Sequence, residues 1–158
     1  APKAPSNGTL ITPARPLDSF TVARRDSDPY TLSDLRAHWT MVLPVGSRCG
    51  PTCQQRLYDT RQIHDALGED RIRVCRIVLA SDGRRTQGLA ALLDQHPRLT
   101  VLEQPSDGPL ARQFPEAAAG TVFLVDPHGN LMMRFAPDVE ADGMLDDLEH
   151  LLKVSRIG

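Results

Sequence analysis

The chain has 158 residues, with 18 Lys and Arg against 20 Asp and Glu, which gives a formal net charge of −2. A chain of this length can bury its own core without metal or disulfide staples. A near-neutral charge balance argues against a general nucleic-acid-binding protein, which would carry a basic excess. The sequence also lacks the run of about twenty apolar residues that crosses a bilayer.

The first sixteen residues differ in composition from the rest of the chain. They hold four prolines separated mostly by small and polar residues, and they show no apolar periodicity. This composition is typical of an extended linker. We therefore predict a Pro-rich linker or tether over residues 1–16 and one folded domain over residues 17–158.

Patterns of strands and helices alternate along the folded domain. The predicted strands cover residues 20–23, 30–32, 38–44, 72–80, 99–102, 121–125 and 131–135, and the predicted helices cover residues 33–35, 51–67, 86–96, 109–114 and 142–153. The first two strands and the last two strands are each joined by turn-forming residues, which predicts a hairpin at either end. This order predicts a thioredoxin-like α/β fold, with a central mixed β-sheet flanked by helices and an N-terminal β-hairpin.

Two cysteines, Cys49 and Cys53, form the candidate site. Cys49 is expected in the loop that leaves the strand over residues 38–44, and Cys53 in the first turn of the next helix. The free N–H groups and partial positive charge of a helix N-terminus stabilise a thiolate, and Arg48 would add to this if its side chain turned inward. A thiolate is both the nucleophile of disulfide exchange and a ligand for Cu(I). Four helical residues advance about 6 Å, a separation that also permits a disulfide.

The sequence resembles the Sco/SenC family of membrane-anchored copper and thiol proteins that act in cytochrome c oxidase assembly. Besides the Cys-x-x-x-Cys pair, the similar stretches are residues 17–20, 32–36, 39–43, 79–82 and 122–129. The resemblance implies that Cys49 and Cys53 are the catalytic residues and, tentatively, Cu(I) ligands. It implies as partner the copper-binding subunit of cytochrome c oxidase, or another thiol or copper protein. It also implies a location on the periplasmic side of the inner membrane, with an anchor in a segment that precedes this chain.

Two elements of related sites are missing from this sequence. The family places a copper-binding histidine a few residues before the strand over residues 121–125, where this chain has residues 116–120 without a histidine. Thiol oxidoreductases of the thioredoxin type have a cis-proline directly before that strand, where this chain has Gly120. His64 and His128 are each expected more than 10 Å from the cysteines, too far to complete a metal site. The prediction is therefore a dithiol without its usual third partner.

The remaining candidate residues have simpler explanations. Cys75 lies in an apolar strand, where a cysteine is usually an inert core residue. Asp82 either flanks the site or is an ordinary loop residue. We expect a packing role for Trp39, packing and surface exposure rather than copper ligation for Met132 and Met133, and surface positions for His38, His96 and His150.

Three functions remain open at this stage. The leading hypothesis is an assembly factor for cytochrome c oxidase that reduces copper-site cysteines, carries Cu(I) transiently, or does both. A peroxiredoxin-like peroxidase is an alternative, although the spacing from Pro44 to Cys49 does not fit that family's frame. The third possibility is a non-catalytic docking domain that keeps the fold and binds a partner.

Overall fold

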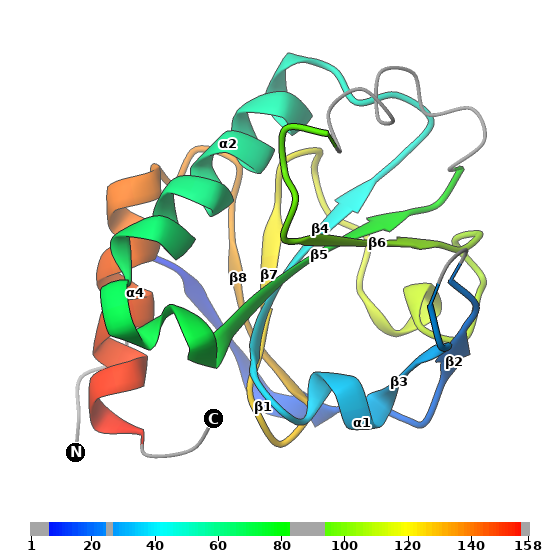
Figure 1. The fold of residues 1–158 in the computed structure, drawn as a ribbon, viewed down its shortest axis with the longest axis horizontal. Coiled ribbons are helices and arrows are strands. Elements are labelled where there is room, and N and C mark those ends of the chain that lie inside the picture. The colour runs from blue at the N-terminus through cyan, green and yellow to red at the C-terminus, as the bar shows by residue number, and fades with distance from the viewer. Residues whose placement is uncertain (1–6, 25–26, 83–93, 156–158) are drawn as a thin grey trace.

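A six-stranded mixed sheet forms the centre of the computed structural model, which describes residues 7–24, 27–82 and 94–155. Figure 1 shows this sheet, in which the strands follow the order β1-β8-β7-β4-β5-β6. β4, β5 and β6 are parallel, whereas β7, β8 and β1 are joined by antiparallel pairing. The strands are β1 (Thr9–Pro16), β4 (Trp39–Val45), β5 (Val74–Ala80), β6 (Leu99–Glu103), β7 (Val122–Val125) and β8 (Asn130–Phe135).

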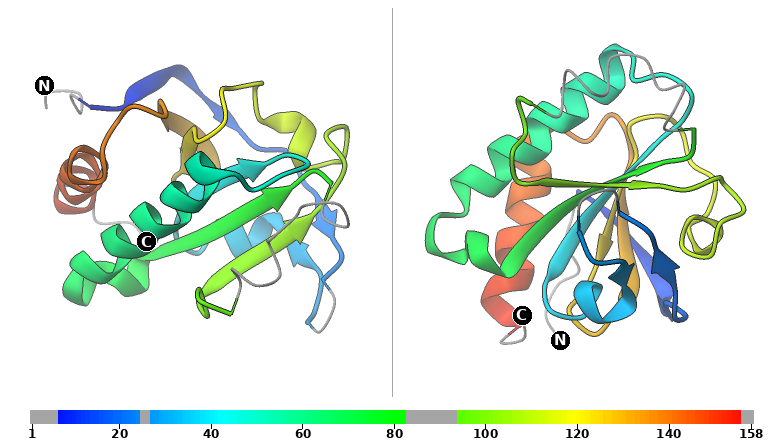
Figure 2. Two further views of the ribbon diagram at one scale, coloured as in Figure 1. Left: turned by 90° about the horizontal axis from the view of Figure 1, so that it is seen from above. Right: turned by 45° about the vertical axis from the view of Figure 1, so that its right-hand side comes forward.

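Helices cover both faces of this sheet (Figures 1 and 2). The long helices α2 (Pro51–Ala66) and α4 (Ala141–Val154) pack together on one face. The other face is covered by smaller elements, namely the two-stranded sheet β2 (Thr21–Val22) and β3 (Tyr30–Thr31), helix α1 (Leu32–Leu35) and the 3-10 turn η2 (Ala111–Gln113). This arrangement confirms the predicted thioredoxin-like fold and its N-terminal hairpin. Among the described residues, no helix is long and apolar enough to cross a membrane.

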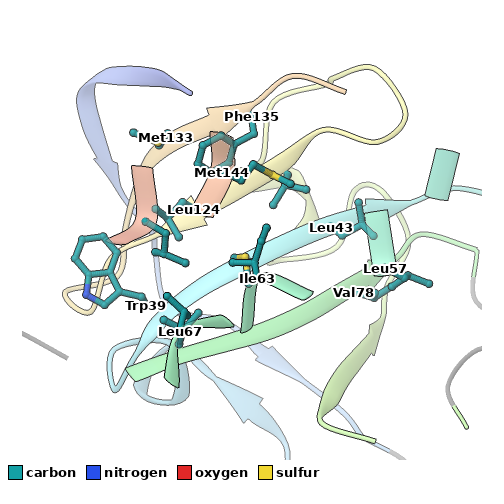
Figure 3. Packing of buried hydrophobic residues seen from close by; sticks show 14 of the residues in the cluster. Trp39, Leu43, Leu57, Ile63, Leu67, Val78, Leu124, Met133, Phe135 and Met144 are labelled. Atoms are coloured by element: carbon teal, nitrogen blue, oxygen red, sulfur yellow. The ribbon is translucent and has the colours of Figure 1, made fainter. Parts of the chain in front are cut away.

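The sheet separates two hydrophobic cores. Side chains alternate along β4, so that Met41 and Leu43 face the long helices while Val42 faces the smaller layer. Figure 3 shows the first core, in which Leu57 and Ile63 from α2 approach the sheet. Trp39 and Met133 also lie in this core, which confirms their predicted packing roles. Both cores contain side chains from the same central strands. Packing on both faces of the sheet therefore fixes the position of the end of β4, and the cysteines follow directly after it.

The structure corrects the predicted linker for residues 9–16, whereas residues 1–6 lie outside the described residues. Thr9–Pro16 make up strand β1, which pairs with β8 at the edge of the sheet through two short stretches separated by an irregularity between Leu10 and Arg15. Nearly all its side chains are exposed, so the segment has no apolar periodicity to reveal it. Its stability comes from backbone hydrogen bonds to a partner more than a hundred residues away, which sequence composition does not report.

Two smaller differences concern the connections around β5. The predicted strand over residues 72–80 begins at Val74, because Gly68–Arg73 form the 3-10 turn η1 after α2. Gly68 ends α2 as predicted and has a φ of 60°, a left-handed value that favours glycine. Most of the predicted helix over residues 86–96 lies outside the described residues.

Candidate functional site

The two cysteines lie where the central strand β4 passes into helix α2. β4 ends at Val45, and a short loop carries the chain through Cys49 to Gly50, the N-cap of α2. Pro51 takes the first helical position, where its missing N–H costs nothing. The side-chain amide of Gln54 donates a hydrogen bond of 3.2 Å to the Cys49 carbonyl and ties the loop to the helix. The sequence prediction for this turn is confirmed.

Cys49 and Cys53 are joined by a disulfide, with their Cα atoms 5.1 Å apart. Their residues differ in exposure: Cys49 is only 4% exposed and belongs to the first core, whereas Cys53 is partly exposed at the margin of that core. The sulfur atoms lie at the N-terminal end of α2, where unpaired N–H groups and the helix dipole stabilise a thiolate once the disulfide is opened. The site can therefore exchange disulfides, and Cys53 is the more approachable of the pair.

Arg48 also contributes to the electrostatics of this turn. Its side chain is exposed, and its Nε atom lies 3.9 Å from the position that a Cβ on Gly50 would occupy. The guanidinium therefore folds back toward the start of α2. A cation in this position favours the thiolate form of a nearby cysteine.

Gly120 stands beside the dithiol in place of the proline or histidine found at comparable sites. Its φ is 91°, and a Cβ on it would lie 2.6 Å from Cγ2 of Thr52, between the two cysteines. The backbone before β7 thus approaches the first turn of α2 more closely than any side chain would allow. In the described part of the chain the cis peptide bond joins Thr12 to Pro13 in β1, not the residues before Thr121.

Arg56, one turn after Cys53, joins α2 to two other segments of the chain, a role that the sequence analysis did not predict. It is 3% exposed, and its guanidinium donates hydrogen bonds to the backbone carbonyls of Gly120, Val139 and Ala136 at 2.7, 2.7 and 2.6 Å. Nη1 also forms an ion pair of 3.2 Å with Asp59. Arg56 therefore fastens α2 to the loop before β7 and to the loop after β8.

The helical spacing of α2 contained the signal for Arg56. Leu57, Thr60 and Ile63 mark the buried face of α2, and Arg56 lies on that face with them. A charged residue on the apolar face of a helix calls for buried partners. The sequence could have revealed that Arg56 is unusual, but not which carbonyls it would meet.

The histidines do not complete a metal site. His64 uses Nε2 to contact the carbonyls of Arg71 and Val74, both at 3.0 Å, and His128 lies in the exposed turn between β7 and β8. Within the described ranges, no group of three or more His, Cys, Asp or Glu side chains is arranged to hold a metal ion. The dithiol itself offers two soft sulfur ligands, which suit Cu(I).

Other sequence predictions have mixed outcomes. Cys75 is a free thiol in β5, half-buried, and burial raises the pKa of its thiol. His96 was expected on the surface but is only 6% exposed, because it packs beside the buried guanidinium of Arg76, whose Nη2 lies 3.5 Å from its Nδ1. Met132 packs partly buried against the first core.

Most of this chain matches one family of known proteins. Residues 39–155, which include both cysteines and Gly120, match the family described as "Transmembrane-like, thioredoxin-like, C-terminal domain". The chain belongs to this family. No curated protein sequence matches the chain.

Solved structures similar to this family member include Sco1 proteins. Apo Sco1 from Thermus thermophilus is 20% identical, with 92% of this chain and 96% of that chain covered and a TM-score of 0.71. Yeast Sco1 with copper bound is 16% identical, with 89% and 90% covered and a TM-score of 0.71. A thiol:disulfide interchange protein from Bacteroides is 11% identical, with 90% and 91% covered and a TM-score of 0.66. The chain thus has a Sco-like thioredoxin fold with a Cys-x-x-x-Cys pair, as the sequence resemblance predicted.

Proposed function

We propose that this domain is a thiol–disulfide exchange protein that reduces the copper-site cysteines of a partner during cytochrome c oxidase assembly. The observation that carries this proposal is the Cys49–Cys53 disulfide across the first turn of α2. The helix N-terminus stabilises the thiolates that exchange requires. The similarity to Sco1 proteins and to a thiol:disulfide interchange protein supports the same chemistry.

The reduced domain transfers two electrons to its target in two exchange steps. The Cys53 thiolate attacks one sulfur of the target disulfide, forming a mixed disulfide and releasing the other target sulfur as a thiolate. The Cys49 thiolate then attacks the Cys53 sulfur, which forms the Cys49–Cys53 disulfide and releases the second target thiolate. The target is reduced, the domain is oxidised, and an external dithiol must reduce it again. Cys53 takes the first role because its residue is the more exposed.

The partner and the location follow from the same proposal. The target is the copper-binding subunit of cytochrome c oxidase or another thiol or copper protein. The domain works on the periplasmic side of the inner membrane, held there by a segment that precedes residue 1. Fractionation of cells that express the full-length protein, with protease treatment of spheroplasts, tests this location.

Transient transport of Cu(I) is a second candidate function. A related structure holds copper, that of yeast Sco1, and both sulfur ligands of such a site are present in this chain. Among the described residues no third ligand is placed with them. A two-thiolate site would pass Cu(I) to a partner by ligand exchange, with no change in the oxidation state of copper.

The redox proposal is tested by equilibrating the protein with glutathione buffers and by trapping a mixed disulfide. We expect a single two-electron transition at Cys49 and Cys53 that Cys75→Ser leaves unchanged. Cys49→Ser should accumulate a mixed disulfide with a target peptide through Cys53, and Cys53→Ser should accumulate less. A pair that stays oxidised even in excess dithiothreitol, or a double serine variant that fully restores oxidase assembly, would contradict the proposal. The latter result would support a docking domain.

The copper proposal is tested by anaerobic Cu(I) titration of the reduced protein against a chromophoric chelator. Stoichiometric binding that disappears in both Cys49→Ser and Cys53→Ser, but persists in Cys75→Ser, would identify a copper carrier. If the chelator removes all copper from the wild-type protein, the copper function is excluded and the redox function stands alone. Turnover of hydrogen peroxide in a parallel assay would favour a peroxidase instead.

A further inference from the structure

Arg76 of β5 is a buried cation without a carboxylate partner. It is 5% exposed, and its Nη2 donates hydrogen bonds to the carbonyl of Leu57 at 2.8 Å and to Oγ1 of Thr60 at 3.0 Å. Nε also donates to Oγ1 of Thr60, at 3.2 Å. These partners are neutral, and the ion pairs among the described residues involve only Arg56 and Arg73. Residues 83–93, which the structure does not describe, contain no Asp or Glu.

An unpaired buried charge is costly, because neutral hydrogen-bond partners replace only part of its hydration. Burial lowers the pKa of Arg76 to about 10, and Asp65 offsets this only partly, so the guanidinium still carries its charge at neutral pH. Its Nη1 has no hydrogen-bond partner among the residues that the structure describes. The fold thus holds the cationic side chain of Arg76 in place while its Nη1 donates no hydrogen bond to the described residues.

Arg76 also lines a cavity of about 430 Å³. It lies between the C-terminal half of α2, η1 and the start of β5, and Arg71 from η1 and Arg98 from the segment before β6 line it together with Arg76. Its lining contains no Asp or Glu. Three arginines from three separate elements therefore meet at one cavity, which makes its potential positive.

We propose that this cavity binds a phosphate-bearing anion. A guanidinium presents a planar fork of donors that matches the oxygen atoms of phosphate, and a bound anion would supply the charge that Arg76 lacks. Arg76 would contact the anion from the base of the cavity, and the exposed Arg71 and Arg98 from its mouth. The site is separate from the dithiol, because His64 on its wall lies eleven residues, or about 16 Å, along α2 from Cys53.

The phosphate group has two sources, a free small molecule and the headgroup of an anionic lipid. Ile72, which also lines the cavity, is 79% exposed. An exposed apolar side chain among arginines suits the surface of an anionic membrane, where the apolar group enters the interface. The experiment therefore includes a vesicle arm.

The first measurement is a titration of the oxidised, isotope-labelled protein with inorganic phosphate, with chloride as the ionic-strength control. We expect the Nε–H signals of Arg71, Arg76 and Arg98 to shift saturably. Arg98→Gln should raise the Kd by about tenfold, since it removes a charge-assisted contact from an exposed position without disturbing the core. Arg112→Gln, an exposed arginine on η2 outside the cavity, should leave the Kd unchanged.

The second measurement is sedimentation with phosphatidylcholine vesicles, with and without phosphatidylglycerol. Retention only on phosphatidylglycerol, reduced by Arg98→Gln and Ile72→Ser, would assign the phosphate to a lipid headgroup. Saturable phosphate binding without retention would assign it to a free small molecule. The proposal is overturned if neither phosphate nor vesicles bind, or if Arg98→Gln and Arg112→Gln weaken binding equally. None of these outcomes depends on the redox function of the cysteines.

Discussion

Arg56 Nε donates a hydrogen bond of 2.7 Å to the carbonyl oxygen of Gly120 and so joins the dithiol helix to the backbone that precedes β7. The same guanidinium holds the loop after β8 through the carbonyls of Ala136 and Val139. The two segments beside the start of α2, one before β7 and one after β8, are therefore positioned by one side chain. The geometry around the cysteines depends on this arginine as well as on the backbone of the helix.

Arg56→Ala should lower the free energy of unfolding by on the order of 3 kcal/mol, because it removes the buried guanidinium that pairs with Asp59 and donates to three backbone carbonyls. Arg56→Lys should recover only part of this loss, since one ammonium cannot reach all three carbonyls. Urea denaturation of the oxidised and reduced proteins provides the measurement. Arg112→Ala is the exposed control and should change stability by less than about 0.5 kcal/mol. A loss below about 1 kcal/mol for Arg56→Ala would contradict the structural role.

Gly120→Ala should destabilise the protein by about 2 kcal/mol, for two separable reasons. The left-handed φ of 91° disfavours a side chain, and the new Cβ would meet Cγ2 of Thr52 at 2.6 Å. Thr52→Ala removes the contact but not the backbone strain. The double variant should therefore regain part of the loss, and a thermodynamic cycle of the four proteins measures the coupling. Purely additive effects would show that the steric contact is unimportant.

Asp147→Asn should loosen the start of the chain and cost about 1–3 kcal/mol. The buried carboxylate of Asp147 accepts hydrogen bonds from the backbone N–H groups of Asn7 and Gly8 at 3.2 and 2.6 Å, and from the Asn7 side chain at 2.9 Å. An asparagine amide can accept only some of these bonds. Limited proteolysis should show faster cleavage before residue 16, and Asp146→Asn, an exposed neighbour, is the matched control. Equal cleavage of the two variants would refute this role of Asp147.

Thr40→Val should leave the stability unchanged or raise it by about 1 kcal/mol. Thr40 is fully buried in the central strand β4, and its Oγ1 has no hydrogen-bond partner in the described structure. Valine has nearly the same shape and removes this unsatisfied group. Chemical denaturation of the two proteins in parallel tests the expectation. A clear loss of stability would mean that the hydroxyl has a partner.

Cys75 should react slowly with iodoacetamide at neutral pH. Burial raises the pKa of its thiol, so less thiolate is present at a given pH than for an ordinary cysteine. In the oxidised protein, where Cys49 and Cys53 are blocked, labelling should increase only at a pH above that needed for the urea-unfolded chain. Mass spectrometry over a pH series provides the comparison. Coincident pH profiles for the folded and unfolded protein would contradict the predicted shift.

The sequence was sufficient to predict the elements that rely on local patterns. An apolar run predicts β4, Pro51 predicts the start of α2, and Gly68 predicts its end. Each of these signals is local, and the elements that they predict are present in the structure. The position of the dithiol follows from the same signals, because a strand end and a helix start meet at Cys49. The sequence therefore predicted the two cysteines of the site and their place in the fold.

The parts that could not be predicted depend on contacts between distant segments. Arg56 donates hydrogen bonds to carbonyls more than sixty residues away, and His96 is buried because it packs beside the guanidinium of Arg76. β1 has exposed side chains and four prolines in or near it, so its composition resembles a linker. In each case the stabilising partner is a backbone group or a side chain that no local window of sequence contains.

The pairing of β1 with β8 has a consequence for the behaviour of the protein in concentrated solution. A protein trimmed at Leu17 would present the full edge of β8, with unsatisfied N–H and C=O groups that a second copy could pair with. β1 covers this edge and offers a poor edge itself, because Pro13 and Pro16 lack donors and the strand is interrupted between Leu10 and Arg15. Strand β1, whose composition resembles that of a tether, thus protects the edge of the sheet from self-association.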